Sequence, residues 1–271
     1  MLEILQYRFM QHAILASVLG GASCGVVGVW IIMMRIPFVG VAMSHAAFAG
    51  AIFGLLLGVN PILMALFFCL VSSGLIGPMA EKAEMDANIS IGIIFSLMLG
   101  FAFLGMGLIP GPKTEALKFI WGNILLISRL DVYLLMAVTF IIFLFLLLFF
   151  KEIQAVLFHR EIARAVGIPE KTIFYLLLFL TGAVVTLNLN TIGGLLIFSL
   201  VVNPPSAAYQ LTYNLRRMFL LSAAFAITSC LIGLLFSYIL NVPTGAVIII
   251  ASSAIFGLCL IFSPKRKAKK I

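Results

Sequence analysis

Long apolar runs separated by short polar breaks account for most of this chain. Several runs approach the roughly 20 residues that a helix needs to cross a bilayer. A backbone in lipid must satisfy its own hydrogen bonds, and the runs lack the period-two alternation of a membrane barrel, so we predict helices. The runs, bounded by charged residues, proline or asparagine, fall at 10–34, 37–59, 61–80, 88–110, 131–150, 172–190, 192–211, 218–240 and 243–263.

We predict eight or nine membrane crossings. Nine full crossings place the N-terminus outside, whereas an interfacial first segment, Leu2 to Gln11, or one broken half-span reduces the number to eight. The weakest run is 192–211, because it contains residues that interrupt a helix: Gly193, Gly194, Asn203, Pro204 and Pro205. Either number gives an all-α membrane protein, a polytopic bundle of eight or nine transmembrane helices in a single domain, residues 1–271.

Composition excludes a water-soluble protein. Of the 271 residues, 63% are hydrophobic and 10% are charged, whereas soluble domains carry about 25% charged residues. The aqueous segments are too short for a soluble catalytic domain. The cysteines lie inside apolar runs without metal-ligand spacing, so we interpret them as packing residues: Cys24, Cys69, Cys230 and Cys259.

Basic residues at the edges of the runs predict the orientation. The formal net charge is +8, and the positive residues gather in the segment Lys151 to Lys171, at Arg216 and Arg217, and in the tail 264–271. The positive-inside rule places these segments and the C-terminus in the cytoplasm. The charge therefore indicates contact with anionic lipid rather than nucleic acid. Residues 111–130 then lie outside, with a short interfacial helix near Trp121.

His45 is the main candidate for chemistry. It lies in the run 37–59, directly after Ser44. An ionisable side chain within a membrane span is a functional candidate by default, and imidazole is the commonest ligand of transition metals. The structural alternative is a buried histidine that donates a hydrogen bond to a carbonyl across a helix interface. Ser44 and His45 do not form a catalytic pair, because adjacent helical residues point about 100° apart.

The same run carries a ridge of small residues at every fourth position. Such rows let two helices approach closely in lipid. We therefore predict that this helix packs inside the bundle, with His45 beside the contact and away from lipid. The ridge consists of Ala42, Ala46, Gly50, Gly54 and Gly58.

The carboxylates bear on the source of energy. All nine Asp and Glu residues lie in loops or at the ends of runs. Carriers driven by protons or sodium ions usually need a charge relay within the membrane. The chain also lacks the G-x-x-x-x-G-K-[ST] phosphate-binding loop. We infer that a separate protein supplies the energy.

The segment 158–170 predicts a short cytoplasmic helix, a stop and a new helix start. Glu161 and Ala163 favour helix, and Gly167 can end it in the left-handed conformation. The expected helix has an apolar stripe, formed by Phe158, Ile162 and Val166, opposite Arg160 and Arg164. Such a helix could lie on lipid or dock in a groove of another protein; an ordinary basic loop is the structural alternative.

The run 37–59, which contains His45, and the segment 158–170 resemble the permease subunits of bacterial and archaeal ABC importers for zinc, manganese and iron. The second span of that family carries Gly-Asp-x-x-Ser-His-Ala, which Gly40, Ser44, His45 and Ala46 match. The coupling segment of the family is matched by Glu161, Ala163, Gly167 and Ile168. The Gly193 to Leu196 run, the prolines 204 and 205, and the start of the last run at Pro243-Thr244-Gly245 also fit, so the similarity covers essentially the whole chain.

The resemblance implies a permease of the plasma membrane that imports a divalent transition metal. It also implies a transmembrane dimer, with a second copy or a paralogue, two cytoplasmic ATPases and an extracytoplasmic metal-binding protein. ATP would be used by the partner, and no cofactor would be bound permanently. We predict that the metal pathway includes Ser44, His45 and Asn203, and that the ATPase-coupling residues are Glu161, Ala163, Arg164 and Gly167.

One departure from the family pattern concerns the metal site, because Val41 stands where the family has Asp. Three explanations are open. Another span could supply an oxygen, with Asn60, Asn123, Asn188, Asn190 and Asn203 as candidates. The metal could differ or arrive in bound form, or this subunit could pair with a second permease that carries the complete site. Two alternative functions follow: an ABC permease for a chelated metal or small organic cofactor, and a self-contained carrier.

Overall fold

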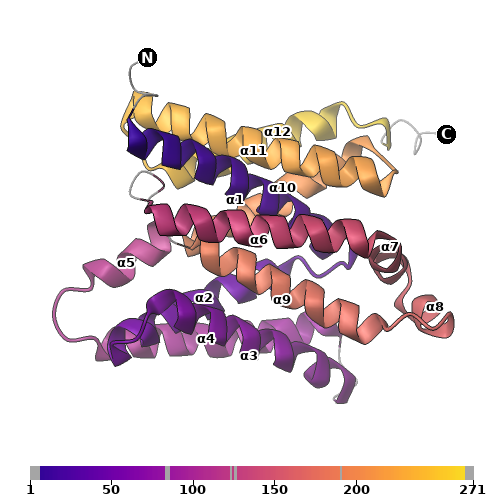
Figure 1. Cartoon of the computed structure of the whole chain (residues 1–271), viewed down its shortest axis with the longest axis horizontal. Helices are drawn as coiled ribbons and strands as arrows, with labels where there is room; N and C mark the ends of the chain where they lie inside the picture. Colours follow the sequence, from indigo (N-terminus) through magenta and orange to yellow (C-terminus); the bar gives the residue numbers. More distant parts are fainter. Residues whose placement is uncertain (1–6, 83–85, 123, 125–126, 190, 266–271) are drawn as a thin grey trace.

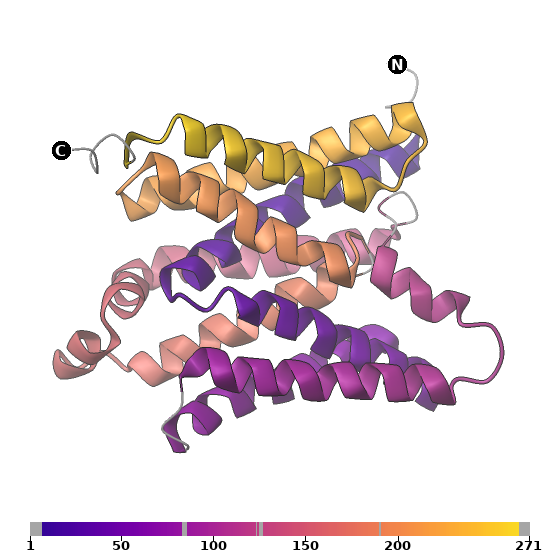
Figure 2. The ribbon, with the colours of Figure 1, turned by 180° about the vertical axis from the view of Figure 1, so that it is seen from behind.

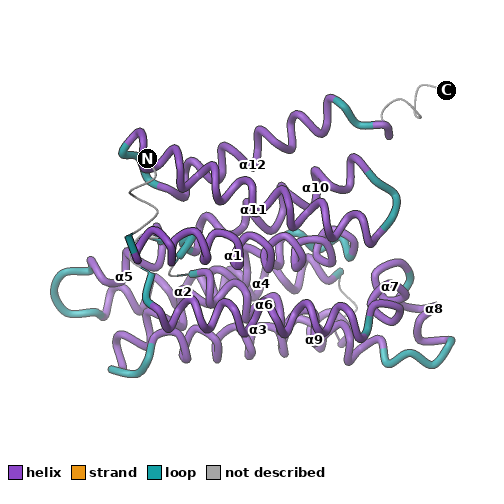
Figure 3. The backbone as a smooth tube through the Cα atoms, turned by 45° about the horizontal axis from the view of Figure 1, so that its top comes forward, coloured by secondary structure: helices purple, strands orange, loops and turns teal. Residues whose placement is uncertain are grey.

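The protein is a bundle of helices of unequal length (Figure 1). The computed structural model describes residues 7–82, 86–122, 124, 127–189 and 191–265, and within these ranges there are helices and loops but no strands (Figure 3). The elements are α1 (Arg8–Met33), α2 (Phe38–Leu57), α3 (Pro61–Lys82), α4 (Ala87–Leu108), α5 (Thr114–Trp121), α6 (Arg129–Leu148), α7 (Phe150–Phe158), α8 (Arg160–Ala165), α9 (Glu170–Asn188), α10 (Gly194–Leu211), α11 (Leu215–Leu240) and α12 (Thr244–Ile261).

The bundle has two distinct ends. The short helix α5 lies at one end, and α7 and α8 lie at the other (Figures 1 and 2). We call these the α5 end and the α8 end. The long helices run between them in alternating directions, so that α1 begins at the α5 end and α12 finishes at the α8 end.

Eight of the described helices are long and apolar enough to cross a membrane: α1, α2, α3, α4, α6, α9, α11 and α12. This confirms the predicted all-α polytopic membrane fold. The ninth long helix, α10, also runs between the two ends (Figure 2). It continues through Pro204 and Pro205, so the expectation that these prolines interrupt the run is wrong.

Close packing around α10 explains why the prolines are tolerated. Pro205 has no N–H for the carbonyl of Val201, four residues earlier. That carbonyl oxygen lies against Gly28 of α1, where an added methyl group would clash with it and with the Pro205 ring. The tertiary contact with α1 thus holds a helix that its own sequence weakens.

The helices differ strongly in burial. In the most apolar window of α1, 78% of the residues are buried inside the protein, compared with 17% in α12. The Trp30 indole on α1 is fully buried and donates a hydrogen bond of 3.0 Å to the Thr181 hydroxyl on α9. On the other side of α1, the Ser222 hydroxyl of α11 donates to the Gly25 carbonyl at 2.6 Å. Hence α1 forms the centre of the fold.

The small-residue ridge of α2 packs where the sequence predicts, with one correction. Ala42 and Ala46 are fully buried. A methyl group added at Gly50 would lie 2.6 Å from the Ala65 Cα atom, and one at Gly54 would lie 2.7 Å from the Pro61 Cα atom, so α3 approaches α2 closely. Gly58 does not take part, because it caps the end of α2 and an added methyl group would have no neighbour within 4 Å.

The loop 111–130 contains the expected short helix, α5, which ends at Trp121. The side chain of Trp121 is 61% exposed. The next long helix begins with a capping box, in which the Ser128 hydroxyl accepts from the Asp131 N–H and the Asp131 carboxylate accepts from the Ser128 N–H. Asp131 is thus a helix-capping residue, as its position at the start of a run suggests.

Candidate functional site

His45 lies on α2 with its ring between α2 and α4. Its Nδ1 atom is 3.0 Å from the carbonyl oxygen of Val41, one turn earlier. A carbonyl only accepts hydrogen bonds, so Nδ1 is the donor in this contact and Nε2 is the ring nitrogen left for a ligand. The ring is half-buried and makes an edge contact with Phe95 of α4, with centroids 4.8 Å apart. A backbone carbonyl that holds one ring nitrogen in this way is a common feature of metal-binding histidines.

A cavity of about 130 Å³ adjoins the His45 ring. Its walls come from four helices, α2, α4, α5 and the start of α10, and are almost entirely apolar. Ser44 also borders the cavity, and its hydroxyl donates to the Gly40 carbonyl at 2.8 Å, so the hydroxyl is occupied within its own helix. The other lining residues are Phe48, Leu99, Phe103, Met106, Ile120 and Gly194.

The described residues of this chain do not form a multi-ligand metal site. They contain no group of three or more His, Cys, Asp or Glu side chains placed to hold an ion. Val41, the position where a carboxylate would share a face with His45, is half-buried. In the described part of the cavity wall, His45 is therefore the one side chain of these four types.

Asn203, the third predicted pathway residue, lies away from His45. Its amide donates to the hydroxyls of Ser252 and Ser253 on α12, at 3.1 and 3.0 Å. Ser44 and His45 thus lie together on α2, whereas Asn203 lies where α10 contacts α12.

The other asparagine candidates have structural surroundings. The side-chain oxygen Oδ1 of Asn60 accepts from the N–H groups of Ile62 and Leu63 in the first turn of α3. Asn188 is fully buried, and its side-chain oxygen, which lacks a hydrogen-bond partner among the described residues, points at Gly20 of α1. Asn123 and Asn190 lie outside the described residues.

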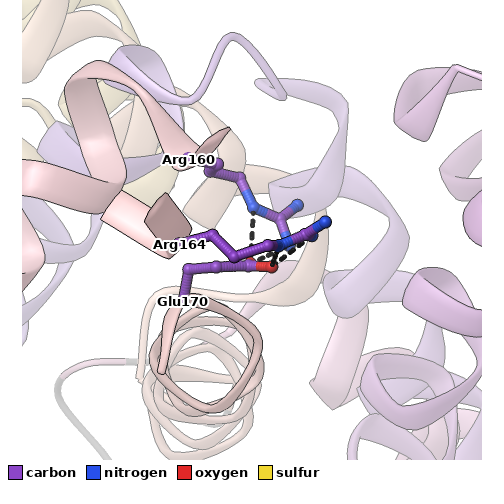
Figure 4. Close-up of polar contacts among 3 residues, drawn as sticks. All are labelled: Arg160, Arg164 and Glu170. Carbon is purple, nitrogen blue, oxygen red and sulfur yellow. Dashed lines mark hydrogen bonds and ion pairs between the residues drawn. The ribbon is translucent and has the colours of Figure 1, made fainter. Parts of the chain in front are cut away.

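Two arginines fasten the predicted coupling helix α8 to α9. Glu170, the first residue of α9, is 2% exposed and accepts bonds from both Arg160 and Arg164 (Figure 4). Arg160 donates from Nε at 3.2 Å and from Nη2 at 2.7 Å, and Arg164 donates from Nε at 2.9 Å and also from Nη2. The Arg160 guanidinium also stacks 4.1 Å above the Phe174 ring. This forked arrangement ties the orientation of α8 to that of α9.

The backbone of this segment follows the sequence closely. Gly167 has φ +83°, a conformation that suits glycine at the end of a helix. The Ile168 N–H donates to the Ala163 carbonyl at 3.0 Å, which closes the last turn of α8. Ala163, in the middle of α8, is buried. Glu161 is exposed, and so are the three residues of the predicted apolar stripe, with Phe158, Ile162 and Val166 at 50%, 60% and 68%. The expectation that one helix carries all three is wrong, because the chain breaks at His159: Phe158 ends α7, Val166 follows the last turn of α8, and Ile162 alone lies within α8.

A chain of contacts connects α8 with the helix that carries His45. Further along α9, the Thr181 hydroxyl accepts the hydrogen bond from Trp30. The next residue, Gly182, packs against Cys69 of α3 and the sulfur of Met43. The Cys69 thiol donates to the Met43 carbonyl at 3.4 Å. Because Met43 lies two residues before His45, these contacts join α9 to this part of α2.

Sequence reasoning missed two members of this chain of contacts. Glu170 was counted only as one of the nine carboxylates in loops or at the ends of runs. Its position just after Pro169, at the start of a helix, was a signal for a capping or anchoring role. Thr181 gave no signal, because a threonine in an apolar run is common and only the fold brings it to Trp30.

Fold and site together define a multi-pass membrane transport subunit. The family model described as ABC 3 transport family matches residues 6–263. The chain belongs to this family of ABC transporter permeases of the cell membrane.

Named relatives and a solved structure agree with this assignment. The chain is 30% identical to the manganese transport system membrane protein MntC of Halalkalibacterium halodurans, over 97% of this chain and 90% of the relative. It is 32% identical to the protein of that name from Listeria monocytogenes, over 97% and 94%. The structure of PsaBC from Streptococcus pneumoniae in complex with Fab has a TM-score of 0.88 at 27% identity, covering 98% of this chain and 96% of that one.

Proposed function

We propose that this permease imports a divalent first-row transition metal, with manganese(II) as the main cargo. The observation that carries the proposal is the His45 imidazole within a membrane-spanning helix, with Nδ1 bonded to a carbonyl and its ring on a cavity wall. Nitrogen ligands favour manganese, iron or zinc over magnesium or calcium. The names of the relatives from Halalkalibacterium and Listeria favour manganese among these three.

The α8 end faces the cytoplasm in this proposal. The described basic residues at the α5 end are Arg8, Lys113, Lys118 and Arg129. Many more lie at the α8 end: Arg35, Lys151, Arg160, Arg164, Lys171, Arg216, Arg217 and Lys265. The positive-inside rule then places the C-terminus in the cytoplasm and the α5 end outside, where the metal-binding protein would deliver its cargo.

His45 acts as a transient ligand or gate rather than as part of a closed site. A pathway must release its ion, and a single imidazole beside an apolar cavity binds weakly enough for that. Because no carboxylate is among the described residues that line the cavity beside His45, the remaining ligands would come from water, backbone carbonyls or a second permease subunit across a dimer interface. A second copy or a paralogue of the chain would supply that subunit.

A separate ATPase would drive transport through α8. Ile162 and Glu161 of α8 offer an exposed docking surface, and the Arg160–Glu170 and Arg164–Glu170 pairs would carry a displacement of α8 into α9. From α9, the Gly182 contact with Met43 and Cys69 leads to the helix of His45. ATP binding by the partner would thus open or close the space beside the imidazole.

Uptake by a reconstituted complex tests the proposed function. The permease, its ATPase and the metal-binding protein are placed in proteoliposomes, and uptake of manganese, zinc and iron is measured with and without ATP. We expect ATP-dependent manganese uptake, reduced at least about ten-fold by His45→Ala, as for loss of other metal-site residues. His12→Ala is the matched control, because His12 lies on α1 at the α5 end, outside the cavity. Full uptake by His45→Ala would contradict the pathway role, and uptake without the ATPase would identify a self-contained carrier.

A further inference from the structure

A second cavity lies at the α8 end, apart from His45. Its volume is about 790 Å³, within the range of small-molecule sites. It is bounded by the end of α1 and the turn into α2, by α7 and the start of α8, by the turn between α10 and α11, and by the residues after α12. In Figure 2 the connection between α1 and α2 runs along the bundle, so that α2 begins further inside than the neighbouring helices.

The charged groups of this cavity are all basic. Arg35, Arg160 and Lys265 line it, together with His159, and no carboxylate is among the described lining residues. Asp86, one residue before the lining residue Ala87, uses its carboxylate to cap α4, where it accepts from the N–H and side-chain amide of Asn88. Such a cavity repels a divalent cation, so it is not a route for the metal.

Two of these cations have no ion pair with a described residue. Arg160 is bound to Glu170, which leaves Arg35 and Lys265. Arg35 sits in the left-handed conformation, φ +60°, which is unusual for a residue other than glycine. Its carbonyl accepts from Asn88 at 3.3 Å, which fixes the turn that presents the guanidinium.

Lys265 is held at the cavity by aromatic rings. Its ammonium lies 3.6 Å from the Tyr209 ring centroid and 4.4 Å from that of Tyr213. The Ser263 hydroxyl, which bonds the Gln210 carbonyl and side-chain oxygens at 3.0 Å, fastens this segment to the end of α10. Partial burial lowers the pKa of Lys265 below its usual value, so an anion that neutralises the ammonium would be favoured there.

Apolar side chains also line this cavity, among them Ile32, Met33, Ile36, Val156 and Met218. Basic pockets between transmembrane helices bind the head groups of anionic lipids, and tyrosine is enriched at the depth of the head groups. A soluble phosphate needs the cations but gains nothing from the apolar walls, whereas a phospholipid uses both.

We propose that this cavity binds an anionic phospholipid from the leaflet at the α8 end, with its phosphate between Arg35 and Lys265. The lipid would cover apolar walls and pair two cations that the described residues leave unpaired. By filling the space between α1, α7 and the α10–α11 turn, it would hold α7 and the adjoining coupling helix in place. This proposal does not depend on which metal is carried or on the role of His45.

Native mass spectrometry of the full-length permease tests the proposal, both alone and in complex with its ATPase. The protein is incubated in detergent with equal amounts of phosphatidylglycerol and phosphatidylcholine, and the ratio of retained lipids is measured. We expect retention of phosphatidylglycerol in both forms, reduced about five-fold for each charge removed by Arg35→Gln or Lys265→Gln. Lys265→Arg should retain the preference. Lys151→Gln, an exposed cation on α7 that does not line the cavity, should leave it unchanged.

Several outcomes would overturn the proposal. One is an unchanged lipid ratio in the Arg35 and Lys265 variants, with melting temperatures in detergent equal to that of the wild type. An equal effect of Lys151→Gln would indicate surface charge alone. Displacement of the lipid by millimolar inorganic phosphate would identify a site for a soluble anion. Loss of the lipid on assembly with the ATPase would assign the cavity to protein contact.

Discussion

Gly122 and Gly193 meet backbone to backbone where α5 returns to the bundle. A methyl group added at Gly193 would lie 2.5 Å from the carbonyl carbon of Trp121, and one added at Gly122 would clash with the Gly193 N–H. Both residues have positive φ, and Gly193 caps the start of α10. This contact places Ile120 and Gly194 on the wall of the His45 cavity. Two residues 71 positions apart in the sequence thus close the space beside the imidazole.

Gly193→Ala should therefore destabilise the protein by about 1–3 kcal/mol, because the new methyl group meets backbone that cannot move aside and because φ is +93°. The measurement is thermal unfolding in detergent, together with uptake by the reconstituted complex. Gly107→Ala is the control, since an added methyl group on this exposed face of α4 has no neighbour within 4 Å. Equal melting temperatures for the two variants would contradict the contact.

The ridge of α2 makes a second prediction. Gly54→Leu should push α3 away from α2, because the Pro61 Cα atom already lies 2.7 Å from the position of an added Cβ. We expect a lower melting temperature and reduced uptake. Gly257→Leu on α12, where an added Cβ meets nothing within 4 Å, is the matched control. A Gly54→Leu protein as stable as the control would refute close packing at this position.

Glu170→Gln should loosen the coupling helix. The substitution removes the charge that both arginines share while keeping the size of the side chain, and we expect a loss of about 1 kcal/mol, since both arginines are partly exposed. Trypsin should cut the segment 160–171 faster, and ATPase recovery in a pull-down should fall. Glu152→Gln on α7 serves as the control, and equal rates of cleavage in the two variants would contradict an anchoring role for Glu170.

The exposed Ile162 side chain of α8 makes a separate prediction about docking. Ile162→Asp should prevent ATPase association without altering the permease, because the Ile162 side chain is 60% exposed and contributes little to the core. Replacing Glu161 or Arg164 should also weaken transport. The measurement is pull-down of the ATPase with the detergent-solubilised permease, and full recovery with Ile162→Asp would place the docking surface elsewhere.

Val41→Asp should change metal selectivity. Asp and His four residues apart share one helix face, so the new carboxylate would stand beside the His45 ring and add an oxygen ligand. We expect tighter manganese binding and a different order of uptake among manganese, zinc and iron. Val41→Asn keeps the shape without the charge. Identical uptake of every metal by all three proteins would count against a pathway along this face.

Thr181→Val tests the connection between α1 and α9. The variant keeps the shape of the side chain but leaves the buried Trp30 N–H without its 3.0 Å acceptor, which costs about 1–3 kcal/mol. Thr181→Ser retains the hydroxyl and should be closer to the wild type. Thermal unfolding of the two variants distinguishes the hydrogen bond from simple packing, and a Thr181→Val protein as stable as Thr181→Ser would exclude a stabilising bond.

Much of the fold followed from local patterns. The nine apolar runs correspond to the nine long helices within a few residues, because a span needs a fixed length and the breaks between spans are polar. The end of the coupling helix and the start of the next helix could also be predicted, since Gly167 and Pro169 are local signals for a helix end and a helix start. The same reasoning failed for the prolines of α10. The contact that supports them joins Val201 to Gly28, which lies 173 positions earlier in the sequence.

The candidate site was predicted only in part. His45 could be selected because an imidazole is expensive in lipid whatever surrounds it. The sequence did not reveal that Asn203 would turn toward α12, that Glu170 would gather two arginines, or that Gly58 would cap a helix instead of packing. Each of these depends on which face a helix presents to a distant neighbour.

The sequence by itself determined that this protein is a helical membrane protein, because hydrophobicity, helix length and charge at the helix ends are summed along the chain and need no partner; the resemblance of its motifs to a known family indicated a permease. Only the tertiary structure decided what surrounds each polar group. An apolar cavity beside His45, a forked ion pair beneath the coupling helix and a basic cavity at the α8 end all arise from residues far apart in the chain, and the packing that joins them leaves no periodic trace in the sequence.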